Sequence, residues 1–227
     1  MKKILALVMA FCASGLLSAQ VNFGIGARGY IGIPAGATLH DDMFNSSYDV
    51  ALFEGVGFGF AVSAQVMQEG MKGFGVGLEL GYAHNEIGWE YSRAKYSMKG
   101  KLSYSSFDIP LTVGYTFAKG NFRITPHVGA YASIPIGDLS FDVERVESDD
   151  NLVSEKTSVS TMDISSKFLF GGVGGVGIGY KVGKGLVNLD ARFMADFPAL
   201  KIDTAKSGVS VMTRRKLTLG LSYVHFF

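Results

Sequence analysis

Cysteine is nearly absent from this sequence, since Cys12 is the only one in 227 residues. It lies in an apolar stretch, Ile4–Leu17, which follows two lysines and is followed by a plausible cleavage point near Ala19. We therefore predict a signal peptide over residues 1–19 and an exported chain over residues 20–227. The exported chain would have no cysteine, which excludes disulfides and a thiol nucleophile.

Long apolar runs are also missing beyond the N-terminus, where none approaches the roughly 18 residues that a membrane-spanning helix needs. The composition is nevertheless apolar for a soluble domain, with 48% hydrophobic residues, 18% charged residues and 30 glycines. Backbone polar groups in lipid must be satisfied within the protein, and a closed β-barrel is the alternative to a helix. The composition therefore favours a barrel.

An excess of one charge is likewise lacking. The formal net charge is +1 at pH 7, so no strong overall field attracts nucleic acid. No spacing of candidate ligands points to a particular metal. We therefore expect no nucleic-acid partner, no cofactor and no metal site.

What the sequence does contain is a period-two alternation of apolar with small or polar residues, repeated in eight segments. Phe74, Val76 and Leu78, for example, are separated by single glycines. The segments lie near residues 21–31, 52–63, 74–82, 107–117, 122–130, 168–180, 187–193 and 216–227. Between them, long polar connections near 34–49, 86–101, 138–165 and 198–213 alternate with tight turns, as in bacterial outer-membrane barrels.

These patterns predict an all-β fold, an eight-stranded antiparallel up-and-down transmembrane β-barrel. Its short turns and both termini would lie in the periplasm and its long loops outside the cell. A soluble barrel of the lipocalin type would expose a face rich in Lys, Glu and Thr. Here the non-apolar face consists mainly of Gly, Ala and Ser with isolated charges, which suits a narrow lumen. We therefore expect the bulky side chains to face lipid.

Charged side chains on the small-residue face are the candidate functional residues. By parity the lumen should hold Arg28, Glu54, Glu79, Asp108, His127, Asp190, Arg192 and Lys216, together with Arg123 and Lys181. Opposite charges in a desolvated lumen must pair, because an unpaired buried charge costs several kcal/mol. Counted from the periplasmic ends of the strands, six of these residues should lie at similar heights: Arg28, Glu79, Asp108, His127, Asp190 and Arg192. The prediction is a plug of ion pairs, and the alternative is a narrow passive channel for small solutes.

A third hypothesis, a surface hydrolase, would use His40, Asp41 and Asp42 to activate a water molecule. A catalytic base needs a partner held within hydrogen-bonding reach, and adjacency in a polar loop does not provide one. We therefore expect no enzyme activity. Pro110 and Pro126 each remove a donor from the strand ladder, so we expect local bulges beside them.

The last segment, Leu217–Phe227, resembles the C-terminal signature of outer-membrane barrels, in which a strand with a terminal Phe is recognised by the assembly machinery. This resemblance implies that Tyr223 and Phe227 form an assembly signal. It also implies contact with outer-membrane lipid. The charged loops suggest that the protein binds lipopolysaccharide, divalent cations or a host or cell-surface partner, whose identity the sequence does not reveal.

A narrower resemblance is to PorT-type outer-membrane barrels. It rests on Phe107–Leu111 followed by Tyr115, on Thr125–Ala130 and on Phe170–Gly172. OmpA-, OmpX- and OmpW-type barrels share the same plan. Because members of the PorT-type family mostly lack an established activity, the resemblance implies fold and location. The expected role is that of a monomeric, integral outer-membrane protein with a structural or surface-interaction function.

Overall fold

The computed structural model describes residues 21–41, 46–50, 55–93, 96–147, 153–164, 168–197, 200–204 and 208–227. The predicted signal peptide, Asp42 and Glu54 lie outside these residues. Within them, no helix is long and apolar enough to cross a membrane.

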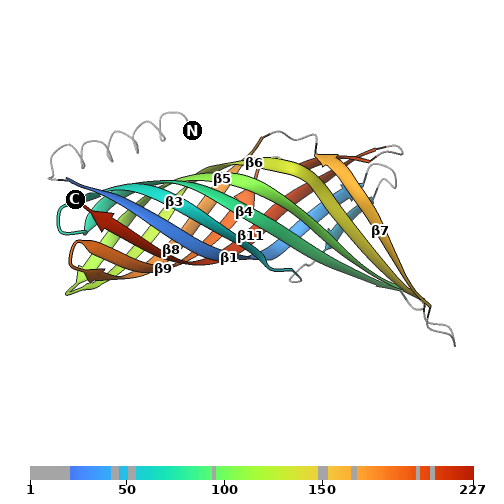
Figure 1. Ribbon diagram of the computed structural model, residues 1–227, viewed down its shortest axis with the longest axis horizontal. Coiled ribbons are helices and arrows are strands. Elements are labelled where there is room, and N and C mark those ends of the chain that lie inside the picture. Colours follow the sequence, from blue (N-terminus) through green and yellow to red (C-terminus); the bar gives the residue numbers. More distant parts are fainter. Residues whose placement is uncertain are drawn as a thin grey trace.

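Eight antiparallel strands form the wall of a closed barrel (Figure 1). In chain order they are β1 (Val21–Asp41), β3 (Gly57–Gln68), β4 (Gly73–Arg93), β5 (Tyr96–Lys119), β6 (Phe122–Glu147), β8 (Leu169–Val182), β9 (Gly185–Asp196) and β11 (Gly208–Phe226). Each pairs with the next, and β1 closes the barrel on β11 from Gly24↔Phe226 to Asp41↔Ser210. The predicted barrel of eight strands is confirmed.

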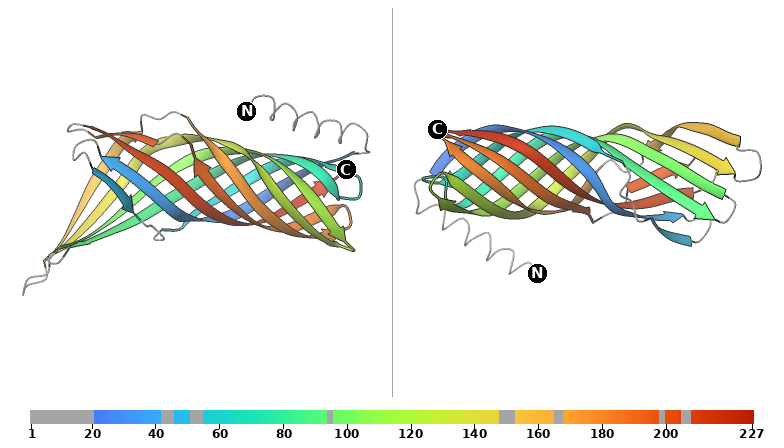
Figure 2. Two further views of the ribbon diagram at one scale, coloured as in Figure 1. Left: turned by 180° about the vertical axis from the view of Figure 1, so that it is seen from behind. Right: turned by 90° about the horizontal axis from the view of Figure 1, so that it is seen from below.

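The strands are inclined to the long axis, as closure of a sheet requires (Figure 2). The tight turns at residues 69–72, 120–121 and 183–184 lie at one end, together with the start of β1 and the end of β11. We call this the turn end and the opposite one the far end. Backbone bonds such as Phe227 N to Phe23 O, 2.9 Å, tie the two terminal strands together at the turn end.

The far end differs from the prediction, because the stretches expected to be loops contain strand. β1, β4, β5, β6 and β11 continue into them, and three further strands lie there: β2 (Ser46–Val50), β7 (Val153–Ile164) and β10 (Leu200–Thr204). β2 pairs with β1, and β10 bridges β7 and β11. Alternation identifies only strands with one apolar face, whereas a strand ladder satisfies backbone groups whatever the side chains.

The two prolines do not produce the expected bulges. Around Pro110 the β4–β5 ladder stops after Leu78↔Leu111 and resumes at Gly81↔Asp108 in unchanged register. Around Pro126 the β5–β6 ladder is interrupted in the same way, again without a shift. Each proline thus causes a short gap in the ladder without a change of register. The prediction of bulges at these positions was wrong.

The bulky side chains point outward, as predicted. Phe60, Phe122 and Val128 are each 62% exposed on the exterior, whereas Arg28 is 5% exposed in the lumen. Aromatic side chains of the exterior include Phe23, Phe117 and Tyr223 near the turn end. The luminal glycines leave room for larger groups: a Cβ at Gly171 would overlap the ring of Tyr131.

Candidate functional site

The middle of the lumen holds a closed ring of four ion-pairing side chains. Arg192 of β9 reaches across to β4 and binds both carboxylate oxygens of Glu79, at 2.6 and 2.9 Å. Arg28 of β1 lies 3.1 Å from Asp190 and 3.8 Å from Glu79, and Arg192 also donates to Asp190. All four side chains are buried. We call Arg28, Glu79, Asp190 and Arg192 the middle layer.

His127 of β6 lies against the middle layer. Its Nε2 is 3.5 Å from Asp190 Oδ2, and its Nδ1 is 3.2 Å from the carbonyl oxygen of Thr125. The side chain is 8% exposed, yet Nε2 has no hydrogen-bond partner. His127 is therefore held by one ring nitrogen only.

A second layer lies further toward the far end. Lys216 Nζ of β11 is 2.8 Å from Asp108 Oδ2 of β5 and donates at 3.4 Å to Asn85. Asp108 Oδ1 also accepts hydrogen bonds from Ser106 at 3.0 Å and Ser133 at 2.6 Å. Each charge in this layer is buried and hydrogen-bonded, so its desolvation is offset.

A third layer was missed from the sequence. Arg214 of β11 binds Asp196 of β9 at 2.9 and 3.2 Å and also donates to the hydroxyl of Tyr104. Tyr131 of β6 also donates to Asp196. The alternation of side chains predicted that the last strand begins near residue 216, so Arg214 was assigned to the preceding loop. Its parity with Lys216 and Thr218 on one strand was the signal that could have placed it in the lumen.

Of the ten predicted luminal residues, the structure brings seven together in two groups, and Glu54 lies outside the described residues. Arg28, Glu79, His127, Asp190 and Arg192 meet in and around the middle layer. Asp108 does not join them as expected but pairs with Lys216 in the next layer. The stagger between inclined strands separates residues that lie equally far along their own strands.

The turn end is closed by an apolar floor, which we define as the buried cluster Met67, Met71, Leu186, Val224 and Phe226. Met71 belongs to the β3–β4 turn and adopts a positive φ of 54°. Arg123 holds this turn: it donates to the carbonyl oxygens of Met71 at 2.7 Å and Gly70 at 3.1 Å, and to that of Gly120 at 2.7 Å. Arg123 therefore connects the β3–β4 turn to the β5–β6 turn through backbone carbonyls and does not join an ion-pair layer.

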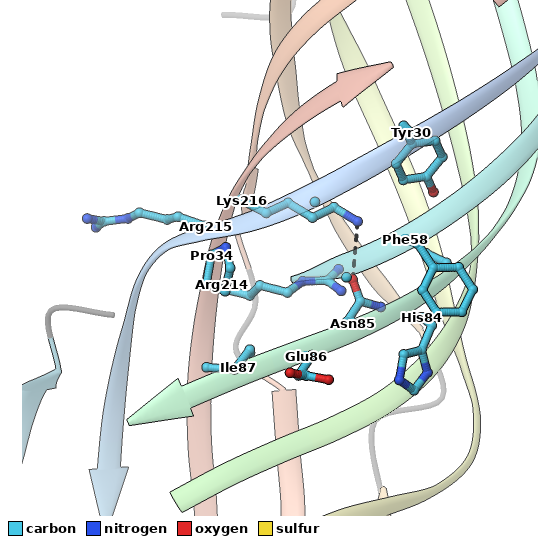
Figure 3. A pocket seen from close by; sticks show the side chains of 13 residues that line it. Tyr30, Pro34, Phe58, His84, Asn85, Glu86, Ile87, Arg214, Arg215 and Lys216 are labelled. Carbon is cyan, nitrogen blue, oxygen red and sulfur yellow. Dashed lines mark hydrogen bonds between the residues drawn. The ribbon is translucent and has the colours of Figure 1, made fainter. Parts of the chain in front are cut away.

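Hollows accompany these layers in the described part of the barrel, and three of them bear on the lumen. One of about 20 Å³ lies at the second layer, where Lys216 reaches Asn85 while Arg215 points away (Figure 3). A second of about 70 Å³, which we call the chamber, lies between the middle layer and the floor. A third of about 420 Å³ opens at the turn end and is lined partly by Met71, Lys181 and Phe226. Lys181 is therefore placed at the mouth rather than inside an ion-pair layer.

The three layers contain four cations (Arg28, Arg192, Arg214 and Lys216) and four carboxylates (Glu79, Asp108, Asp190 and Asp196). Such a set can fill and cross-link a lumen at little cost, since each charge has a partner. Among the described residues, no group of three or more His, Cys, Asp or Glu side chains is arranged to hold a metal ion.

The hydrolase hypothesis depends on the end of β1 and the connection after it. Asp42 and the side chains of His40 and Asp41 lie outside the described part of the structure. His84 approaches the hydroxyl of Ser105 at 3.4 Å and packs on Phe58, and within the described residues no carboxylate is bonded to it. The predicted assembly signal lies on the exterior, where Tyr223 and Phe227 are both exposed.

Comparison with known proteins gives a family and a fold. The profile of a family described as "Outer membrane protein beta-barrel domain" matches residues 18–197. No curated protein sequence matches the chain. The crystal structure of the outer membrane protein OprG from Pseudomonas aeruginosa is similar with a TM-score of 0.56 and 13% identity, over 92% of this chain and 97% of that one.

Two further solved structures are more distant. A major outer membrane protein from Thermus thermophilus matches with a TM-score of 0.46 and 16% identity, over 91% of this chain and 99% of that one. The outer membrane protease OmpT from Escherichia coli matches with a TM-score of 0.33 and 9% identity, over 90% and 97%. At such identities the similarity to OprG concerns the fold alone.

Proposed function

Because the chain belongs to the outer membrane protein beta-barrel domain family, we propose that it is an integral outer-membrane barrel with a plugged lumen and a structural or surface-interaction role. The observation that carries the proposal is the stacking of three ion-pair layers across the lumen. An eight-stranded barrel has an interior just wide enough for side chains to fill. Four buried guanidinium or ammonium groups with four carboxylates supply that filling.

The orientation and partners belong to the same proposal. The turn end would face the periplasm with both termini, as short turns do in bacterial barrels. Lipid and lipopolysaccharide would contact the apolar exterior, and the far end would meet an unidentified surface ligand. The assembly machinery would recognise Tyr223 and Phe227, and the barrel would function as a monomer. The narrower kinship with PorT-type barrels rests on the motifs around Pro110, Pro126 and Gly171 alone.

Conductance across a planar lipid bilayer tests the plug. The refolded protein should give no steady single-channel steps, because buried pairs such as Arg192–Glu79 block the lumen. Steady steps from the unmodified protein would contradict the proposal.

A narrow passive channel is the second candidate function, and the observation in its favour is the polar chamber of about 70 Å³ below the middle layer. Under this alternative, Glu79→Gln and Arg192→Gln would change the size of a conductance already present in the unmodified protein. Under the plug proposal they would lower stability. Glu86→Gln is the matched control, since Glu86 pairs with exposed Lys101 outside the lumen at 2.7 Å. No described contact favours the hydrolase hypothesis, whose test is loss of any hydrolysis in His40→Ala.

A further inference from the structure

The chamber is polar although it lies inside the barrel. Its lining includes Thr112, Thr116, Thr125 and Asn188, with Glu79, Asp190 and Arg192 of the middle layer above and Met67, Leu186 and Val224 of the floor below. An internal water molecule needs about 10–15 Å³ of such space and two to four polar partners. A volume of about 70 Å³ therefore has room for several water molecules.

His127 points to what occupies the chamber. The carbonyl oxygen of Thr125 can only accept, so Nδ1 carries the proton in the 3.2 Å contact. Nε2 lies 3.5 Å from Asp190 Oδ2 without a hydrogen bond, farther than the roughly 2.7–2.9 Å of a charge-assisted bond, so the geometry is that of a neutral ring whose Nε2 acceptor faces another acceptor. Both arginines of the middle layer bind Asp190 through Oδ1, which leaves Oδ2 turned toward His127. Two acceptors at this distance require a donor that reaches both, and a water molecule has two O–H groups.

The floor that separates the chamber from the turn end is thin. Met67, Leu186 and Val224 line the chamber, whereas Met71 and Phe226 line the outer hollow. These five side chains form one cluster, so the barrier consists of two side-chain layers. The outer layer includes Met71, which belongs to the four-residue β3–β4 turn. Arg123 holds this turn in place by hydrogen bonds to its carbonyl oxygens.

We propose that the chamber is a water-binding site in which one molecule bridges His127 Nε2 and Asp190 Oδ2, with the β3–β4 turn as its lid. The ligand class is water and neutral polar solutes of similar size. The inference goes beyond the proposed function and does not depend on it: a plugged barrel and a conducting one can both contain the chamber. Bilayer conductance tests the plug, whereas methionine oxidation and thiol accessibility test the water-binding chamber.

Hydroxyl-radical labelling by a short X-ray pulse tests the bound water, because bound water is converted to radicals in place. Met67 and Met194 form a matched pair, since each is 5% exposed. Met67 lines the chamber, whereas Met194 packs with Tyr131 and Val173 in an apolar cluster. With a scavenger in the bulk solvent, Met67 should oxidise about tenfold faster than Met194, since a dry apolar site holds no water.

Equal, slow oxidation of the two methionines would overturn the inference. His127→Phe removes the acceptor and displaces the bridging water, so Met67 should then oxidise more slowly than in the unmodified protein. His127→Gln keeps a polar group there and should retain fast oxidation. Fast oxidation of Met67 in the Phe variant would mean that the water does not depend on His127.

Thiol accessibility tests the lid in the full chain with Cys12→Ser, which leaves no other cysteine. A cysteine placed in the chamber by Thr125→Cys should resist a small charged thiol reagent in the folded barrel. Adding Arg123→Ala releases the turn and should expose the thiol, whereas Lys119→Ala, an exposed residue near the same end, should not. Folding is checked by the heat-dependent gel mobility of the barrel. Protection in both variants, or reaction in both, would overturn the assignment of the lid.

Discussion

Asp190 connects both arginines of the middle layer to His127. Its carboxylate faces Arg28, Arg192 and His127, which come from three different strands. Removal of one member of a buried ion pair leaves the other charge in the lumen without a partner. The loss of stability is then larger than when both members are replaced by apolar residues. Asp190 and Glu79 together therefore determine whether the two arginines are tolerated in the lumen.

Asp190→Asn should lower the free energy of unfolding by about 3–5 kcal/mol, because both arginines lose a charged partner in a desolvated site. Equilibrium unfolding in urea with the barrel in lipid vesicles measures the loss. Glu86→Gln, which breaks the exposed pair with Lys101, should cost less than about 1 kcal/mol. Equal losses in the two variants would show that burial does not set the cost.

Six of the eight charges in the luminal layers could be predicted from the sequence, but their pairing could not. Parity along a strand decides the face, so Arg28, Glu79 and Lys216 were assigned correctly to the interior. Pairing depends on the stagger between strands, which no local pattern records, and Asp108 was consequently placed in the wrong layer. Arg214 was missed because the strand was expected to begin after it.

At the scale of elements, the close approach of β5 and β6 requires glycine. A Cβ at Gly129 would overlap the carbonyl oxygen of Leu111 and lie 2.8 Å from Thr112 Cα, both of which are backbone atoms of the neighbouring strand. Backbone atoms cannot move aside as a flexible side chain can. The many glycines of the sequence were evident, but which of them face a neighbouring backbone depends on register.

Gly129→Ala should therefore destabilise the barrel by about 1–3 kcal/mol through forced separation of β5 and β6. Gly174→Ala is the control: its Cβ would meet nothing nearer than His127 O at 3.9 Å. That variant should change stability by less than about 0.5 kcal/mol. The urea midpoint and the temperature at which gel mobility changes both report the difference, and similar midpoints for the two variants would refute the argument.

The strands β2, β7 and β10 show what the alternation of side chains cannot predict. β2 and β10 have only five residues each, and no sustained alternation of apolar with polar residues runs through β7, so the period-two signal that predicts a wall strand is lacking. The eight wall strands could be predicted because one face of each meets an apolar exterior. Toward the far end, strands continue to pair through their backbones although their side chains no longer alternate.

For the whole molecule, assembly can be separated from stability with two exposed tyrosines. Tyr223 is 48% exposed on β11 and Tyr180 is 45% exposed on β8, both near the turn end. If the last strand carries the assembly signal, Tyr223→Ser should reduce the folded fraction in the outer membrane several-fold, whereas Tyr180→Ser should not. Pulse labelling followed by heat-dependent gel mobility measures that fraction. Equal effects of the two substitutions would indicate lost aromatic contacts with lipid instead.

The equality of cations and carboxylates in the three luminal layers has an electrical consequence. A charge moved through a membrane potential gains about 2.3 kcal/mol per 100 mV for each elementary unit. Four positive and four negative groups that move together sum to zero, so a voltage step performs no net work on the ion-pair network as a body. Voltage alone therefore provides no means of displacing it.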